Sequence, residues 1–154
     1  MVSNKIQQPS TPDPKAALLI KRYAAGERTF CKVALYKEQL RVFGPNLSGM
    51  ILPKGKLTDI VLSRANLSYT NLSETQLNRA DLSHANLSKA NLSRANLTAA
   101  NLSRANLEGA NLSQTNLNGA NLSRANLLGA DISGVDLRNT TLMQAIMPDG
   151  TIHD

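Results

Sequence analysis

A leucine recurs at every fifth position over about two thirds of this chain. Twenty such positions follow one another from Leu47 to Leu142, and the one exception among them is Ile132. Two residues before the leucine, the seventeen positions from 65 to 145 hold twelve Ala, four Thr and Val135. Between these two columns, the fifteen positions from 66 to 136 hold eleven Asn, three Asp and Gln76. The repeat is therefore Ala-Asn-Leu-Ser-Xaa.

A period of five fits neither regular secondary structure. On an α-helix, residues five apart are rotated by about 140°, so the leucines would spiral over every face. Along a continuous strand, an odd spacing sends successive leucines to opposite faces. Within one repeat, however, Ala and Leu are two apart, so a short extended segment points both to one side. The pattern predicts a chain that turns after each such segment, with Asn and Ser in the turns, and that coils around a core of Leu and Ala.

Residues 46–145 resemble the pentapeptide-repeat family, whose motif is A-(D/N)-L-x-x. The resemblance implies an all-β fold, a right-handed quadrilateral β-helix (solenoid) with four repeats in each coil. Similar ten-residue blocks begin at positions 61, 81, 101 and 121, which also favours a coil of 20 residues. Twenty repeats would then make about five coils and a rod roughly 24 Å long. The expected structural core includes Leu67, Leu87, Leu107, Leu127, Ala85, Ala105 and Ala125.

The chain divides into four expected parts. Residues 1–12 are expected to form a disordered tail, and residues 13–45 a short N-terminal capping helix followed by degenerate repeats. Residues 46–147 form the pentapeptide-repeat β-helix, and residues 148–154 a C-terminal turn and tail. Caps are expected because a β-helix otherwise leaves exposed strand edges at both ends.

The helix is predicted between Asp13-Pro14, a helix start signal, and Gly26, a terminator. Its apolar residues are Leu18, Leu19, Ile20 and Tyr23. We expect it to pack on the first coil; the alternative is a membrane-surface helix, since Lys15, Lys21 and Arg22 surround the apolar patch.

After the helix, Phe30, Leu35 and Leu40 are again five apart, which predicts degenerate repeats with a two-residue insertion around Gly44-Pro45.

The net charge of +6 is unevenly distributed. Residues 1–45 carry eight Lys or Arg against three Asp or Glu, whereas the rest carries nine against eight. The N-terminal segment is therefore basic and the body nearly neutral. The chain has no apolar run of the roughly 18 residues needed for a transmembrane segment and no apolar signal at the N-terminus. With Cys31 as the only cysteine, these features lead us to expect a cytoplasmic protein without an intrachain disulfide.

Residues suited to catalysis are few. The two histidines, His84 and His153, are far apart in the sequence, and no His lies near Cys31. Neither a phosphate-binding glycine loop nor a metal-ligand spacing is present. We therefore expect no catalytic residue, no metal site, no cofactor and no enzymatic activity. The Asn-Leu-Ser sequence at Asn86 is a glycosylation motif only in form, because the repeat itself generates it.

The variable fifth residue of the repeat is the expected place for a binding site. With 20 residues in each coil, Arg64, His84, Arg104 and Arg124 would align in one column about 4.8 Å apart. Such a candidate binding stripe could bind a polyanion, an acidic partner surface or phosphate. The alternative is that these side chains are simply solvated, since Arg79 and Arg94 occupy the same position in other columns.

These features favour a non-catalytic protein–protein interaction scaffold, with a regulatory role, that presents the flat faces of a rigid β-helix. The alternative is binding of a polyanion, either nucleic acid or an acidic membrane surface, through the basic N-terminal segment and the arginine column. The resemblance also implies that some relatives bind DNA topoisomerases by imitating DNA. That role needs an acidic surface, so the near-neutral body argues against it. The partner is unknown, and an end-to-end homodimer stays open.

Overall fold

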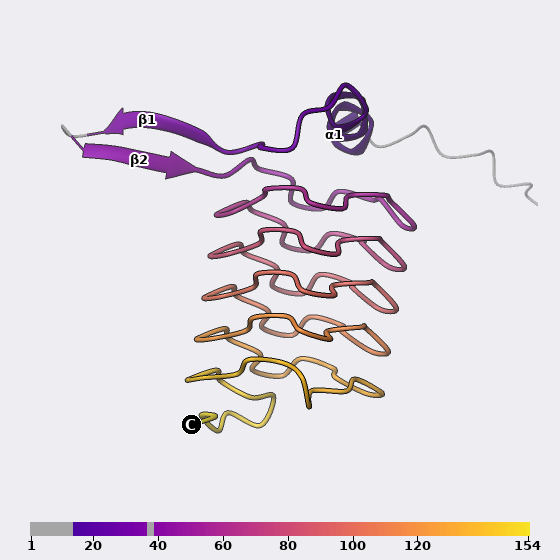
Figure 1. Ribbon diagram of the computed structural model, residues 1–154, viewed down its shortest axis with the longest axis vertical. Helices are drawn as coiled ribbons and strands as arrows, with labels where there is room; N and C mark the ends of the chain where they lie inside the picture. The colour runs from indigo at the N-terminus through magenta and orange to yellow at the C-terminus, as the bar shows by residue number, and fades with distance from the viewer. Residues whose placement is uncertain (1–13, 37–38) are drawn as a thin grey trace, which may run out of the picture.

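The structure, a computed structural model, describes residues 14–36 and 39–154. The predicted disordered tail, residues 1–12, and the predicted helix cap Asp13 lie outside the described residues. The described elements are a helix, α1 (Pro14–Ala24), and two strands, β1 (Lys32–Tyr36) and β2 (Gln39–Phe43). A stack of coils follows them to the C-terminus, as Figure 1 shows.

The coils are joined by parallel bridges between residues 20 apart, from Asn46 with Asn66 to Asn126 with Ile146. Each bridge has two backbone hydrogen bonds: in that of Asn66 with Asn86, Asn86 N–H donates to the Ala65 carbonyl at 2.9 Å and Leu67 N–H donates to the Asn86 carbonyl at 2.7 Å. A turn separates each bridge from the next five residues on, which gives four sides to a coil. The chain is thus a β-helix solenoid in which each coil pairs with the coils on either side.

The turns explain the polar residues of the repeat. The side-chain oxygen of Asn86 accepts the N–H of Ser88 at 3.1 Å, and the same contact recurs along the rod. Asparagine favours turns through this kind of bond. The fifth residue that follows has a left-handed backbone, with φ between 55° and 59° at fourteen non-glycine positions. This conformation places Cβ close to the following carbonyl oxygen and favours glycine.

The interior is a ladder of Leu and Ala. The seven core residues named above are between 0% and 2% exposed. Threonines in the alanine column are buried without losing hydrogen bonds, since Thr115 Oγ1 donates to the Leu92 carbonyl at 2.7 Å. Larger side chains fill this column in the first coil, where Met50 and Ile60 are buried, and in the regular coils it is close-packed with Ala and Thr.

Helix α1 covers the N-terminal end of the stack. Ala16 and Leu19 are buried in the core, and the Tyr23 hydroxyl donates to the Thr58 carbonyl at 2.9 Å. Leu18, included in the predicted apolar set, is 57% exposed and does not pack there. The helix stops at Ala24, two residues before Gly26, where φ is +91°. The N–H of Gly26 bonds the Tyr23 carbonyl and that of Glu27 bonds the Arg22 carbonyl, the Schellman pattern that satisfies the last carbonyls.

The prediction for residues 32–43 is wrong. Thr29 bridges Val61, and the buried Phe30 takes a leucine position, so one degenerate repeat exists there. Leu35 and Leu40 instead lie opposite one another in an antiparallel hairpin of β1 and β2. The insertion is this whole hairpin, not two residues near Gly44. Figure 1 shows it extending sideways from the first coil.

The last residues fold back on the stack. Ile152 pairs with Ile146 in an antiparallel bridge after a turn closed by Gly150 N–H and the Met147 carbonyl at 2.9 Å. His153 N–H donates to the Ala145 carbonyl at 2.9 Å. Residues 151–153 therefore cover one edge of the last coil and do not form a free tail. Within the described ranges, no helix is long and apolar enough to cross a bilayer.

Candidate functional site

The four residues of the predicted stripe lie one above another on a single corner of the coils. The backbone N–H groups of Arg64, His84 and Arg104 each donate to the carbonyl of a serine in the next coil at 2.9 Å. Their φ values are 58–59°, and their side chains are exposed. Arg124 continues the corner with the same backbone geometry. We call Arg64, His84, Arg104 and Arg124 the arginine column.

No carboxylate pairs with the arginine column in the described part of the chain. The ion pairs of the rod lie on other corners: Lys54 with Glu74, Arg79 with Asp59, and Arg138 with Asp136. Arg124 Nε donates to the neutral Gln144 side chain at 2.9 Å. The column therefore has an uncompensated positive field, which attracts anionic groups and is screened by salt.

The pKa of His84 is lowered within the arginine column. Partial burial lowers its pKa from the usual 6.5, the positive charges of Arg64 and Arg104 lower it further, and Asp81 opposes them. The imidazole is consequently neutral at pH 7. It adds a hydrogen-bonding group between two cations and becomes a further cation only in acid.

The other three corners differ in character. Their fifth positions include several glycines, carboxylates opposite cations, and the exposed Tyr69, whose ring lies 6.0 Å from the Lys89 ammonium. A glycine exposes flat backbone, and a paired carboxylate cancels the local charge. The arginine column thus holds three exposed arginines on one corner, while Lys89 and Arg94 lie on two other corners.

The hairpin leaves the stack at the corner occupied by the arginine column. Cys31 Sγ, just before β1, lies 3.0 Å from the Ser63 carbonyl. Gly44, just after β2, packs so closely that an added Cβ would lie 2.2 Å from the backbone of Arg64 and Ala65. Only glycine fits this close approach. Sequence analysis missed this continuity, because Leu35 and Leu40 match the five-residue spacing by coincidence.

The described residues contain no group of three or more His, Cys, Asp or Glu side chains positioned to hold a metal ion. His153, in the C-terminal segment, contacts the Asp154 carbonyl and lies outside the arginine column. Acid and base groups therefore do not converge on His84 beyond the nearby Asp81. The properties of the arginine column are therefore its positive charge and its shape.

The coils match a known sequence profile. The sequence profile described as pentapeptide repeats (8 copies) matches four overlapping segments, residues 46–79, 60–98, 75–114 and 105–144. No curated protein matches the chain.

Two solved structures with TM-scores of 0.60 or more are among those similar to the chain. One is a pentapeptide-repeat protein, Rfr23, of the cyanobacterium Cyanothece 51142. It is 37% identical, with a TM-score of 0.68, over 73% of this chain and 90% of that protein. The other is a pentapeptide-repeat protein of the Arabidopsis thaliana thylakoid lumen. It is 32% identical, with a TM-score of 0.60, over 63% of this chain and 68% of that protein.

Proposed function

This chain belongs to the pentapeptide-repeat family, and from that premise we propose that it is a non-catalytic scaffold that binds an acidic protein partner along the arginine column. Members of the family are structural or interaction proteins and are generally not enzymes. The proposed role is regulatory: the rod of about five coils holds a partner without changing it chemically.

The observation that carries the proposal is the unpaired charge of the column. Three exposed arginines repeat on one corner without a carboxylate among the described residues, while Lys54, Arg79 and Arg138 on other corners each pair with one. Like charges this close repel one another, and a partner's carboxylates would relieve that repulsion. The rigid backbone supports the same interpretation, because side chains on a fixed ladder lose less entropy on binding.

The left-handed corner adds a second argument. Gly109, Gly119 and Gly129 occupy the fifth position without steric cost, whereas arginine there costs about 1 kcal/mol. Arginine at three of the four levels of one corner is therefore a stability cost that a binding role would explain.

The test is affinity capture from cytosolic extract with three proteins: the wild type, Arg64/Arg104/Arg124→Glu, and a matched control, Lys54/Lys89/Arg94→Glu. All six positions are exposed fifth positions with left-handed backbone, so both variants change the net charge and the backbone equally. We expect a protein partner retained by the wild type and the control and lost by the column variant. A partner lost equally from both variants would show that only net charge matters and would overturn the proposal.

Polyanion binding is the second candidate, favoured by the hairpin. The hairpin belongs to the basic N-terminal segment and joins the stack beside Arg64, so the two basic features are continuous. Phosphate contacts by three arginines would make log K fall with log salt with a slope of about −2 to −3. Nucleic acid captured with this steep salt dependence, in place of a protein, would favour this candidate.

A further inference from the structure

One bridge is missing from the ladder of the last coil. On the side that carries Gln76, Asn96 and Asn116, Gln76 bridges Asn96 and Asn96 bridges Asn116, but Asn116 does not bridge Asp136. The flanking sides are closed, since Asn111 bridges Asp131 and Asn121 bridges Thr141. We call the opening between residues 115–117 and 135–137 the ladder gap.

The ladder gap leaves a donor and an acceptor unpaired. In a closed bridge such as that of Asn96 with Asn116, Leu97 N–H donates to the Asn116 carbonyl at 2.8 Å and Asn116 N–H donates to the Ala95 carbonyl at 3.0 Å. The equivalent bonds of Leu117 N–H and of the Thr115 carbonyl with Asp136 are absent. Leu117 is only 1% exposed, and an unpaired amide in such a setting costs free energy comparable to a lost hydrogen bond.

Three residues explain why the gap is open. The Asp136 carboxylate binds Arg138, whose Nη2 lies 2.6 Å from Oδ2, whereas the carboxylate of Asp131, which does bridge Asn111, accepts from the Ser133 hydroxyl. Asn139 is a fifth-position residue without the left-handed backbone found in the regular turns. The pairing shifts by one residue there, because Gly119 N–H bonds the carbonyl of Asn139 at 3.0 Å and not that of Arg138.

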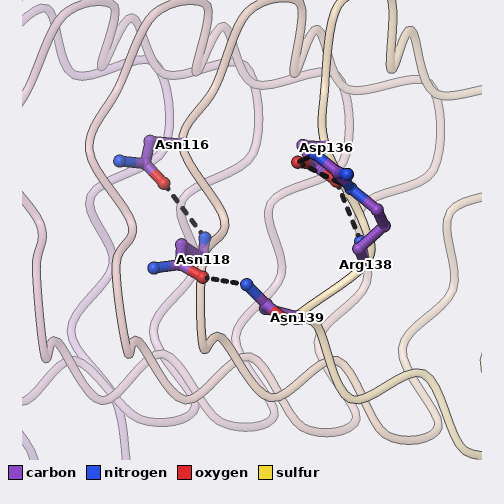
Figure 2. Close-up of polar contacts among 5 residues, drawn as sticks. All are labelled: Asn116, Asn118, Asp136, Arg138 and Asn139. Atoms are coloured by element: carbon purple, nitrogen blue, oxygen red, sulfur yellow. Dashed lines mark hydrogen bonds and ion pairs between the residues drawn. The ribbon is translucent and has the colours of Figure 1, made fainter.

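The gap forms a cleft of about 400 Å³ lined by residues 114–118 and by Gly134, Asp136 and Asn139. Figure 2 shows Asp136 turned towards Arg138 and set apart from Asn116, while the Asn118 and Asn139 side chains meet across the shifted pairing. A volume of this size lies within the range of ligand-binding pockets.

We propose that the ladder gap binds an extended peptide segment of a partner protein by β-strand addition. One residue of the peptide takes the place that Asp136 leaves vacant: its N–H donates to the Thr115 carbonyl, and its carbonyl accepts from Leu117 N–H. Main-chain bonds of this kind give affinity in strand addition, and side-chain contacts give specificity.

Asparagine is the preferred residue at that place. Elsewhere in the rod an asparagine amide donates to the side chain one coil before it, as from Asn126 to Asn106 at 3.3 Å and from Asn96 to Gln76 at 3.2 Å. The Asn116 oxygen accepts one bond from Asn118 N–H at 3.0 Å and retains a second lone pair. A carboxamide on the peptide can donate to it, whereas a carboxylate would face it oxygen to oxygen.

The test uses the peptide acetyl-Ala-Asn-Leu-Ser-Ala-amide and the ¹⁵N-labelled protein. We expect saturable shifts centred on the Leu117 amide and smaller ones at Asn116 and Asn118. The same peptide methylated at the backbone nitrogen of its asparagine cannot donate to the Thr115 carbonyl and should bind about tenfold more weakly. The peptide with aspartate in place of asparagine should also bind about tenfold more weakly. Equal binding of the methylated peptide, or no shift of Leu117, would overturn the proposal.

A variant that closes the gap gives a second measurement. Asp136→Asn/Arg138→Ser/Asn139→Gly restores the repeat, so the 116–136 bridge should form, hydrogen exchange of Leu117 should slow and peptide binding should be lost. Undiminished peptide binding by a closed variant would also overturn the proposal. The peptide comparison on the wild type decides the matter if the variant does not fold. Neither measurement involves the arginine column, so this proposal and the proposed function fail independently.

Discussion

The regular coils, residues 61–130, and the last coil, residues 131–147, share one repeat. They differ in how completely their side chains are buried and their bridges are formed. Leu97 and Leu107 in the regular coils are fully buried, while Ile132 and Leu137 at equivalent positions are only partly buried. The regular coils have a neighbour on both sides. The last coil has one on only part of its outer side, where residues 151–153 pair with residues 144–147. Burial in a solenoid thus comes from stacking as much as from the repeat.

The same comparison separates the two proposed sites. In the regular coils every corner is fixed by backbone bonds, so side chains such as Arg104 are presented from a rigid support. In the last coil a bridge is open, and the backbone itself becomes available for bonding. A closed ladder offers side chains to a partner, whereas an open one offers main-chain groups.

The largest expected effect comes from overfilling a regular coil. Ala95 is 1% exposed, and Ala95→Phe should abolish the cooperative thermal transition, because overpacking costs about 3 kcal/mol or more where nothing can move. The exposed Ala99 provides the control, and Ala99→Phe should melt within a few degrees of the wild type. Val135→Phe, in the half-open coil, should fall between the two. Circular dichroism measures the melting temperatures. Equal values for the variants at 95 and 99 would contradict the assigned register.

A smaller difference is expected for cavities. Leu107→Ala should lower the free energy of unfolding by about 3–5 kcal/mol, since the surrounding ladder cannot collapse. Leu137→Ala should cost about 1–2 kcal/mol, because that side chain is already partly exposed. Urea denaturation measures both. A loss at position 137 as large as that at position 107 would mean that the last coil is closed in solution.

A glycine substitution at the fifth position should raise the free energy of unfolding in the regular coils but not in the last coil. Arg104→Gly relieves a left-handed backbone and should raise the free energy of unfolding by about 1 kcal/mol. Asn139 lacks that conformation, so Asn139→Gly alone should be neutral or cost about 0.5–1 kcal/mol in backbone entropy. Thermal denaturation of the two variants checks this. A gain at both positions would show that the turn at Asn139 is an ordinary one.

The smallest effect concerns Asp136 in acid. Hydrogen bonds from Arg138 lower the pKa of Asp136 from 3.8 to about 2. A carboxyl with a lowered folded pKa stabilises the fold above its unfolded pKa and loses that contribution as the pH falls towards 2. Arg138→Ala should return the pKa of Asp136 towards 3.8 in an NMR titration. An unchanged pKa would show that Arg138 does not hold this carboxylate in solution.

The sequence predicts the regular coils well for a physical reason. Inward positions repeat every five residues, and the alternative elements cannot bury such a pattern, so Leu87 and Ala85 could be placed in the core at once. The alignment of Arg64 with Arg104 follows from the same 20-residue period. Ion pairs follow this period too, since Lys54 with Glu74 and Asp59 with Arg79 are 20 residues apart, and the arginine column has no carboxylate in that register.

The irregular parts escaped prediction because they obey local rules that imitate the repeat. Leu35 and Leu40 have the right spacing but belong to a hairpin whose cross-strand pairing decides their positions. Asp136 fits the Asn/Asp column, yet Arg138 two residues later draws its carboxylate away from the ladder. The backbone of Asn139 differs from that of the other corners, and no residue type in the repeat indicates this.

Closed coils hold the arginine column on a rigid backbone, while the last coil stays open on one side. Amide hydrogen exchange on the wild-type protein distinguishes the two regions. We expect slow exchange at the amides of Leu87, Leu107, Arg64 and Arg104, all bonded to the next coil, and exchange at Leu117 faster by orders of magnitude. Leu117 as well protected as Leu107, or column amides exchanging as fast as Leu117, would contradict it.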